Sequence, residues 1–179
     1  MQSVLILVSL LILDHAEAPA LPHPRDALLL IELWDMKAAL ARTGLFLNEE
    51  ICHTLPNWRQ WTLTEAKRRT IQSLNHLEWA WSVLNGYPVL TCFELGPLPA
   101  PAASQLWRAS DEKAWTDLYI EWLWRWKDGS YKMVEFFYIE PKGQLDRRSE
   151  LWLSEADEFG LMLMAEGESE TSMMRDVLC

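Results

Sequence analysis

The sequence predicts an all-α fold, an irregular bundle of helices around a tryptophan-rich core. Hydrophobic residues occupy 50% of the 179 positions and only 7 are glycine, a composition typical of one globular domain. Most of the 11 tryptophans recur at the i, i+3, i+4 spacing of a helix face. An indole that enters a core buries about 150–250 Å². These rows therefore favour helices packed on one another over tryptophans that a ligand covers.

The first 24 residues predict an apolar helix followed by a linker. An uninterrupted apolar run extends over 4–13, so we expect a buried helix over 4–16, and three prolines follow within 19–24. The small residues Ala16 and Ala18 after the run also fit the cleavage site of a secretory signal peptide, although no Lys or Arg precedes the run. The run is too short to span a bilayer. Sequencing the N-terminus of the cellular protein would separate the two interpretations, since cleavage leaves a start near Pro19.

The next helix is predicted over about 25–42, and Gly44 stands where a left-handed cap belongs. One face of this helix carries apolar side chains at helical spacing, and we expect them to point inward: Ala27, Leu30, Ile31, Trp34, Ala38 and Ala41. Residues 45–61 contain Pro56 and the pair Trp58 and Trp61, and they predict a loop or short turns.

A second helix is predicted from Thr62 to Asn85. Thr62 and Glu65 fit a capping box, and Gly86 and Pro88 follow the predicted end. Its expected inward stripe consists of Ile71, Leu74, Leu77, Trp81 and Leu84.

The polar face of that helix carries the cluster Lys67-Arg68-Arg69. Glu65 stands four residues before Arg69, the spacing of a surface ion pair. We therefore interpret the cluster as a solvated or interdomain face, and His76 as a residue at the boundary of the core.

Prolines at 97, 99 and 101 predict an extended connector, and a short helix through Gln105-Leu106-Trp107 follows. The next helix is predicted to begin at Ser110-Asp111-Glu112 and to stop at Asp128-Gly129. Its expected packing face is strongly aromatic and consists of Trp115, Leu118, Tyr119, Trp122 and Trp126.

Residues 131–141 combine aromatic and β-branched side chains in a helical neighbourhood, and we interpret them as helix. The last helix is predicted over about 146–165, with Gly160 as an unfavourable interior residue. Its expected inward residues are Trp152, Ala156, Phe159 and Leu163. The predicted organisation is therefore an N-terminal helix and linker over 1–24, a helical domain over 25–166 and an acidic flexible tail over 167–179.

The charge of the chain argues against direct binding to nucleic acid. The 26 acids and 16 bases give a net charge of −10, and residues 140–179 alone contribute −6. Affinity for a phosphate backbone requires clustered Lys and Arg, and the sequence has no sustained basic stripe.

Catalytic, cofactor and metal motifs are not found. Cys52, Cys92 and Cys179 are far apart and form no C-x-x-C pair, so neither a zinc site nor a disulfide framework is predicted. Cys52 and His53 are adjacent, so their side chains are expected to diverge, and no glycine-rich phosphate loop occurs. Asp111-Glu112 is interpreted as a helix start, and Glu155, Asp157 and Glu158 as a solvated face. We assign no catalytic, cofactor-binding or metal-binding residue and predict no enzymatic activity.

Three segments, residues 57–90, 92–109 and 145–166, together resemble the C-terminal part of the fungal-specific transcription-factor domain. This domain is the helical regulatory domain of fungal zinc-finger and zinc-cluster regulators. The resemblance covers roughly 58–166 and rests on the order of four short motifs. They are W-x-x-W at Trp58 and Trp61, E-x-x-R-R at Glu65, Arg68 and Arg69, the sequence Gly86-Tyr87-Pro88, and Leu98-Pro99.

The resemblance implies an all-α domain that acts in the nucleus in transcriptional control, for instance of a metabolic or secondary-metabolite gene set. The cysteines or Cys₂His₂ fingers of the family's DNA-binding region have no counterpart here. We therefore expect this chain to act through protein partners of the transcription machinery, another regulator or a small-molecule effector, without a membrane. Trp58, Trp61, Arg68 and Arg69 are the residues to test for structural and coupling roles, and they are not assigned as a site.

Two other functions are kept as alternatives. One is a small secreted or lumenal helical protein that uses the signal peptide described above. The other is an all-α enzyme with a tryptophan-lined pocket, which a deep cavity with converging carboxylates or a metal would favour.

Overall fold

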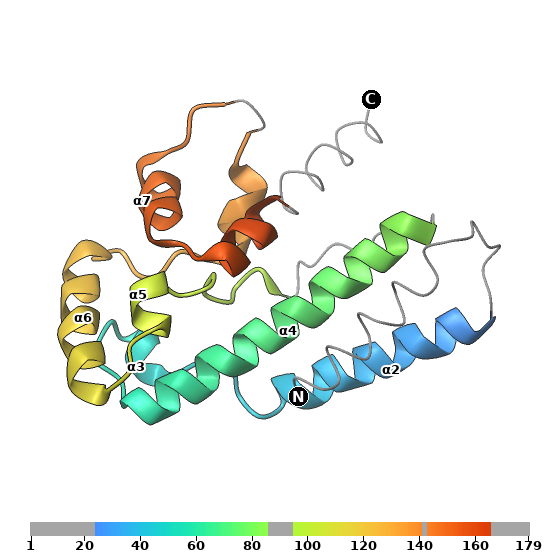
Figure 1. Ribbon diagram of the computed structural model, residues 1–179, viewed down its shortest axis with the longest axis horizontal. Coiled ribbons are helices and arrows are strands. Elements are labelled where there is room, and N and C mark those ends of the chain that lie inside the picture. The colour runs from blue at the N-terminus through green and yellow to red at the C-terminus, as the bar shows by residue number, and fades with distance from the viewer. Residues whose placement is uncertain (1–23, 86–94, 141–142, 166–179) are drawn as a thin grey trace. The chain divides into compact units, whose positions relative to one another are not determined.

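The computed structural model describes residues 24–85, 95–140 and 143–165 (Figure 1). The fold is all-α, as predicted, and the described residues include no β-structure beyond an isolated bridge between Pro99 and Lys132. The expected helix over 4–16, the signal peptide, the acidic tail and the Gly86-Tyr87-Pro88 motif lie outside the described residues.

The chain divides into two compact units. Unit 1 comprises Met1–Gly44 and Arg69–Cys92, and unit 2 comprises Leu45–Arg68 and Phe93–Cys179. The region predicted as one domain over 25–166 thus contributes to both units, and the long helix α4 (Trp58–Asn85) contributes its first turns to unit 2 and the rest to unit 1.

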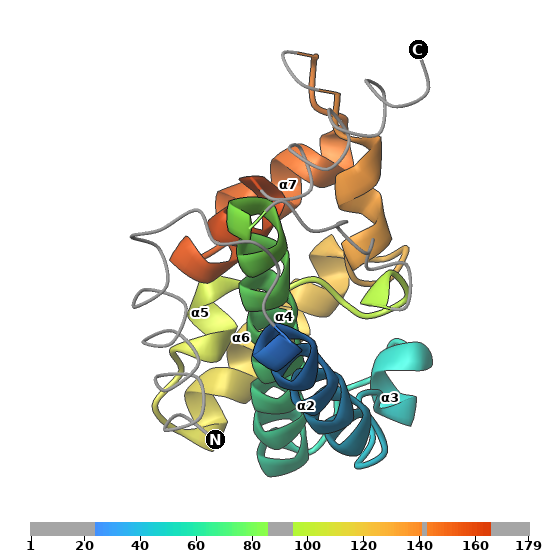
Figure 2. The same cartoon turned by 90° about the vertical axis from the view of Figure 1, so that its right-hand side faces the viewer.

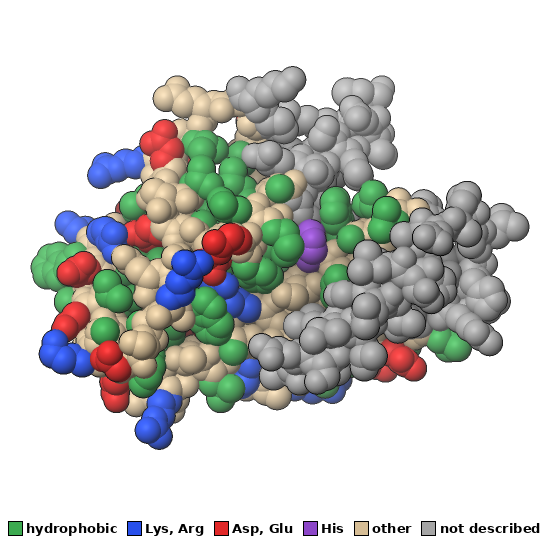
Figure 3. All heavy atoms as spheres, viewed as in Figure 1, with side chains coloured by type: hydrophobic (Ala, Val, Ile, Leu, Met, Phe, Trp, Pro, Cys, Tyr) green, Lys and Arg blue, Asp and Glu red, His purple; other side chains and the backbone are tan. Residues whose placement is uncertain are grey.

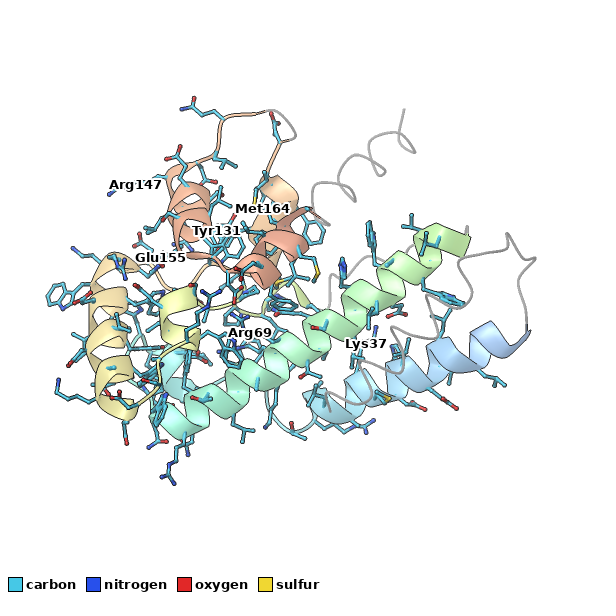
Figure 4. All side chains as sticks on the ribbon, in the orientation of Figure 1. Lys37, Arg69, Tyr131, Arg147, Glu155 and Met164 are labelled. Carbon is cyan, nitrogen blue, oxygen red and sulfur yellow. The ribbon has the colours of Figure 1, made fainter. Side chains whose placement is uncertain are left out.

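In unit 1, helix α2 (Pro24–Ala41) packs against the second part of α4, and the two run in opposite directions (Figure 1 and Figure 2). Leu33, Leu74 and Trp81 are buried at their contact. An ion pair between Lys37 of α2 and Glu78 of α4 lies beside this core (Figure 4). Gly44 has a φ of +88°, so the predicted left-handed position after the helix is confirmed.

The predicted inward face of α2 is wrong in part. Ile31 and Trp34 are exposed, whereas Leu33, which was not in the predicted stripe, is buried. The apolar side chains of α2 lie on several of its faces, so their spacing in the sequence does not identify the buried face. Contact with Leu74 and Trp81 selects the face that holds Leu33. Leu84 of α4, also predicted inward, is exposed.

Helix α4 begins at Trp58 rather than at Thr62, so the predicted capping box is wrong. The side-chain oxygen of Asn57 accepts hydrogen bonds from the amides of Arg59 and Gln60, at 3.1 and 3.2 Å, as an N-cap residue does. Thr62 lies inside the helix, where its hydroxyl donates to the carbonyl of Trp58. Both tryptophans of W-x-x-W therefore lie on the first turn of α4.

Unit 2 contains the short helices α3 (Asn48–Ile51) and α5 (Ser104–Trp107) and the longer α6 (Glu112–Arg125). The predicted start of α6 is confirmed, because the Asp111 carboxylate accepts from the amide of Ala114 at 2.9 Å. Helix α5 packs on α6 (Figure 2), and their shared core buries Trp61, Leu106, Trp115 and Tyr119.

The remainder of unit 2 follows α6. The 3-10 helix η2 (Met133–Tyr138) forms where helix was predicted, and α7 (Arg147–Glu155) follows it. Of the predicted extended connector, residues 95–98 form a turn, in which the amide of Leu98 donates to Leu95 O, and Pro99 then forms the bridge with Lys132, directly before η2. Around this bridge the amide of Ala100 donates to Tyr131 O, and that of Met133 to Leu98 O. A second core lies here, and it buries Ala100, Trp126, Tyr131, Phe136, Ile139, Trp152 and Leu163.

A continuous series of aromatic contacts, the aromatic row, joins the two cores of unit 2. It passes through Trp61, Trp115, Tyr119, Trp122, Trp126, Tyr131, Phe136 and Trp152, with neighbouring ring centroids 4.7–6.3 Å apart. The predicted packing face supplies half of these rings, Trp115, Tyr119, Trp122 and Trp126, so its role in helix packing is confirmed.

The predicted single helix over 146–165 is interrupted. Helix α7 ends at Glu155, Ala156 is extended with a ψ of 151°, and helix resumes over 158–165. Asp157 accepts from the amide of Gly160 at 3.0 Å and so begins a new helix. A Cβ atom on Gly160 would lie 3.0 Å from Cζ2 of Trp152, so this glycine permits a close approach.

Candidate functional site

A buried ionic cluster, defined by Glu50, Glu65 and Arg68, lies beside the first core of unit 2. The Arg68 guanidinium donates to both carboxylate oxygens of Glu50 at 2.8 Å each, and its Nε donates to Glu65 at 3.1 Å. Glu65 and Arg68 are each only 1% exposed. The predicted solvated face is therefore wrong for Arg68, and Glu65, predicted as a surface residue, is buried.

Position in the chain explains how this cluster forms. Glu65 and Arg68 are three residues apart on α4, so their side chains lie on one face, while Glu50 comes from α3. The other oxygen of Glu65 accepts from the amide of Ala102 at 3.0 Å. The cluster thereby ties α3 and the proline-rich connector to α4.

The electrostatics of the cluster favour the charged form of the arginine. Burial opposes that charge, but the carboxylates of Glu65 and Glu50 outweigh burial and raise the Arg68 pKa. Burial, together with nearby Glu50, raises the pKa of the Tyr119 hydroxyl and keeps it neutral. Arg68 is therefore held in its charged form and the Tyr119 hydroxyl in its neutral form.

The space beside the cluster is small. A cavity of about 30 Å³ lies among Trp61, Glu65, Arg68, Tyr119 and neighbouring residues. This volume accommodates about one water molecule. The cluster is therefore a structural centre and not a substrate pocket.

The four residues chosen from the sequence fall into different environments. The Trp61 ring is buried 5.2 Å from that of Trp115, and Trp58 packs half-buried against the same core. Arg68 joins the ionic cluster. Arg69 is half-buried in unit 1, and its carbonyl accepts from the hydroxyl of Ser73 (Figure 4). Three of the four therefore support the packing of unit 2.

Other candidate groups have structural contacts. A ring nitrogen of His53 lies 2.9 Å from Leu123 O, and Cys52 is exposed. His76, half-buried as predicted, stacks on Trp79 with centroids 5.8 Å apart. Among the residues that the structure describes, no three His, Cys, Asp or Glu side chains gather as metal ligands would.

The predicted solvated acidic face of the last helix is largely wrong. Glu155 is half-buried, and it accepts from the indole of Trp126 at 3.0 Å and pairs with Arg125 (Figure 4). Asp157 is buried as the helix-starting residue described above. Glu158 is solvated, and it forms an exposed ion pair with Arg108.

A cleft of about 760 Å³ lies in unit 2 between the end of α6 and the first turns of α7, and sequence reasoning did not find it. Its lining comes from two short stretches, 124–128 and residues 147, 148, 150 and 151. It includes four basic and two acidic side chains and two tryptophans. Figure 3 shows Lys and Arg side chains interspersed with Asp and Glu over α6 and α7 at the left of the view.

Arg148 forms one wall of this cleft. Its guanidinium lies over the Trp126 ring at 5.3 Å, donates to Glu135 at 3.0 and 3.1 Å, and donates to Ser130 O. The hydrogen bonds to Glu135 outweigh burial and raise the Arg148 pKa. This arginine therefore joins α7 to η2 and shapes the cleft.

None of the helices over the described residues combines the length and hydropathy that a membrane crossing requires. No protein-family model, curated protein or solved structure matches this chain.

Proposed function

We propose that the chain is a helical regulatory domain of the fungal-specific transcription-factor type, which acts in the nucleus through contacts with protein partners or a small-molecule effector. The proposal assigns neither catalysis nor DNA recognition to the described residues. Its biological setting would be the control of a metabolic or secondary-metabolite gene set.

One observation carries the proposal: four residues of the resemblance, Trp61, Glu65, Arg68 and Leu98, are buried in unit 2. Trp61 of W-x-x-W lies in the first core, and Glu65 and Arg68 of E-x-x-R-R form the ionic cluster with Glu50. Leu98 of the Leu-Pro motif is buried, and its carbonyl accepts from Met133. Motifs that specify a family's fold are expected at such positions, because a lost contact there would disturb several elements at once.

The proposal is tested by tethering the chain to DNA. Residues 1–179 are fused to the DNA-binding domain of a bacterial repressor and expressed in fungal cells that carry a reporter gene behind the matching operator. We expect a severalfold change in reporter expression relative to the repressor domain alone. A fusion carrying Arg59→Ala, at an exposed position of α4, should retain the effect, whereas Arg68→Met should lose it.

Localisation gives a second readout of the same proposal. The chain fused to a fluorescent protein is expected to accumulate in the nucleus. Nuclear, folded fusion protein that leaves the reporter unchanged would count against a regulatory role. Accumulation in the secretory pathway would instead favour the secreted alternative.

A further inference from the structure

The cleft between α6 and α7 has the size of a small-molecule site. Its volume of about 760 Å³ falls within the range of about 300–1,000 Å³ that small-ligand pockets occupy. By contrast, the cavity at the ionic cluster holds about one water molecule. Of these two spaces among the described residues, the cleft alone has room for a small organic ligand.

Two of the four basic residues in the cleft are available to a ligand. Arg125 pairs with Glu155, and Arg148 is held by Glu135. Lys127 and Arg147 are exposed and form no ion pair with any described residue, and Arg147 extends outward from α7 (Figure 4). An anionic group between them would meet two positive charges on a chain whose net charge is −10.

The same cleft presents an uncovered aromatic ring. Trp124 is 71% exposed, while the neighbouring Trp126 is buried under the Arg148 guanidinium. An exposed indole offers an apolar face on which a planar ring can stack. Such stacking stabilises a complex by more than the burial of apolar area alone. Trp124 thus supplies the apolar half of a site whose polar half is Lys127 and Arg147.

The acids of the cleft restrict the charge of the ligand. Asp128 and Glu150 also line it, so a polyanion such as a nucleic acid would meet repulsion as well as attraction. A compact ligand with one anionic group can contact the basic side chains while its hydroxyl or amine groups donate to these carboxylates.

We propose that this cleft binds a small organic molecule that combines a planar ring with one anionic group, the ring on Trp124 and the anion between Lys127 and Arg147. The binding site is argued independently of the regulatory role. Only the view that its ligand acts as an effector rests on the proposed function.

The proposal is tested with naphthoate as a probe, by isothermal titration of the full chain. Naphthoate is compared with naphthalenemethanol, which keeps the ring without the charge, and with acetate, which keeps the charge without the ring. We expect naphthoate to bind with a Kd of about 1 mM or below, as the ligand efficiency of organic molecules gives for its size. The two partial probes should bind at least about threefold more weakly.

Naphthyl phosphate, used in parallel, shows which anion the site prefers, and either preference fits the shared ring-and-anion chemistry. Raising the salt concentration from about 0.05 to 0.5 M should weaken the binding of naphthoate and leave the binding of naphthalenemethanol unchanged, because salt screens only the ionic contact.

Matched variants locate the site. Trp124→Ala and Arg147→Ala should each weaken naphthoate binding about three- to tenfold. Tyr138→Ala removes an equally exposed aromatic ring outside the cleft, Arg59→Ala removes an exposed arginine outside it, and neither should change the Kd. Unchanged unfolding midpoints in urea verify that the exposed substitutions leave the fold intact.

The proposed site would be overturned if the parent chain did not bind naphthoate up to about 10 mM. It would also be overturned if Trp124→Ala and Arg147→Ala bound naphthoate as tightly as the parent chain. The reporter assay is independent of this result. Naphthoate binding without any reporter effect would retain the site and reject its regulatory role. A reporter effect without naphthoate binding would retain the regulatory function and reject the site.

Discussion

Arg68 links two helices of unit 2 through a buried charge. Its side chain crosses from α4 to α3 and keeps its charge in a buried position, because two carboxylates surround it. Removing one member of such a cluster leaves the others buried and unpaired, which costs much more than losing a surface ion pair.

Replacing this residue gives the first prediction. Arg68→Met keeps much of the side-chain volume but removes the guanidinium that pairs with buried Glu65 and with Glu50. We expect a loss of about 3–5 kcal/mol in the free energy of unfolding, measured by urea titration. The control is Arg59→Ala on the exposed side of the same helix, expected within about 0.5 kcal/mol of the parent chain. Equal stability of Arg68→Met and the control would show that the cluster is energetically unimportant.

Asp146 gives a prediction that depends on pH. Its carboxylate accepts from the amides of Ser149 and Arg148, at 3.0 and 2.7 Å, at the start of α7. The hydrogen bond from the Ser149 amide, followed by the Ser149 hydroxyl and the Arg148 amide, holds the pKa of Asp146 below its usual range. Asp146→Ala should therefore cost about 1 kcal/mol at neutral pH.

The sign of the pH effect follows from the lowered pKa. The stabilisation by Asp146 is complete above the unfolded-state pKa of about 3.9, and it is lost as the pH falls through the lower pKa of the folded state. The difference between Asp146→Ala and the parent chain in urea titrations should shrink accordingly in acid. A difference that stays constant across this range would argue against the capping hydrogen bonds as its source.

Among the elements, the interruption at 156–157 places the last helical segment against the second core. Ala156 and Phe159 pack there, and Gly160 lies against the ring of Trp152. Trp152 has little room to move, because it stacks on Tyr131 and its indole donates to Pro101 O.

Gly160→Ala tests that close approach. Alanine favours helix over glycine by about 1 kcal/mol, but its Cβ would crowd the fixed indole of Trp152. We expect the crowding to prevail, with a net loss of about 1–2 kcal/mol in unfolding free energy. Glu158→Ala, on the exposed side of the same segment, serves as the control. A stabilised Gly160→Ala would mean that the ring can yield.

Local signals predicted the elements that local contacts determine. Asp111 caps α6 within its own first turn, and the aromatic spacing identified the buried face of α6. The start of α4 was missed because Asn57, directly after Pro56, was interpreted as loop. The interruption at 156–157 was missed because Asp157 is an acceptable helix residue until its side chain caps Gly160.

Contacts between distant segments could not be predicted in the same way. Burial of Arg68 depends on Glu50, which belongs to another helix, so the basic cluster resembled a surface face in the sequence. The cleft depends on Lys127 and Arg147, two basic residues that are far apart in the sequence and that packing places around one space.

At the scale of the whole molecule, net charge governs the expected behaviour toward DNA. With a charge of −10, the purified chain should show no sequence-specific DNA binding at physiological salt. Fluorescence anisotropy with labelled duplex pools measures this directly. Nanomolar, sequence-specific retention would contradict it, since that is the affinity range of dedicated DNA-binding proteins.

The aromatic row also gives unit 2 an optical signature. Its neighbouring rings, with centroids 4.7–6.3 Å apart, are near enough for their electronic transitions to couple. Coupled bands of this kind overlap the peptide signal in ultraviolet circular dichroism, so helix content calculated from such spectra will be distorted. The same bands vanish once the rings lose their mutual orientation, and they therefore offer a label-free signal for the melting of this core.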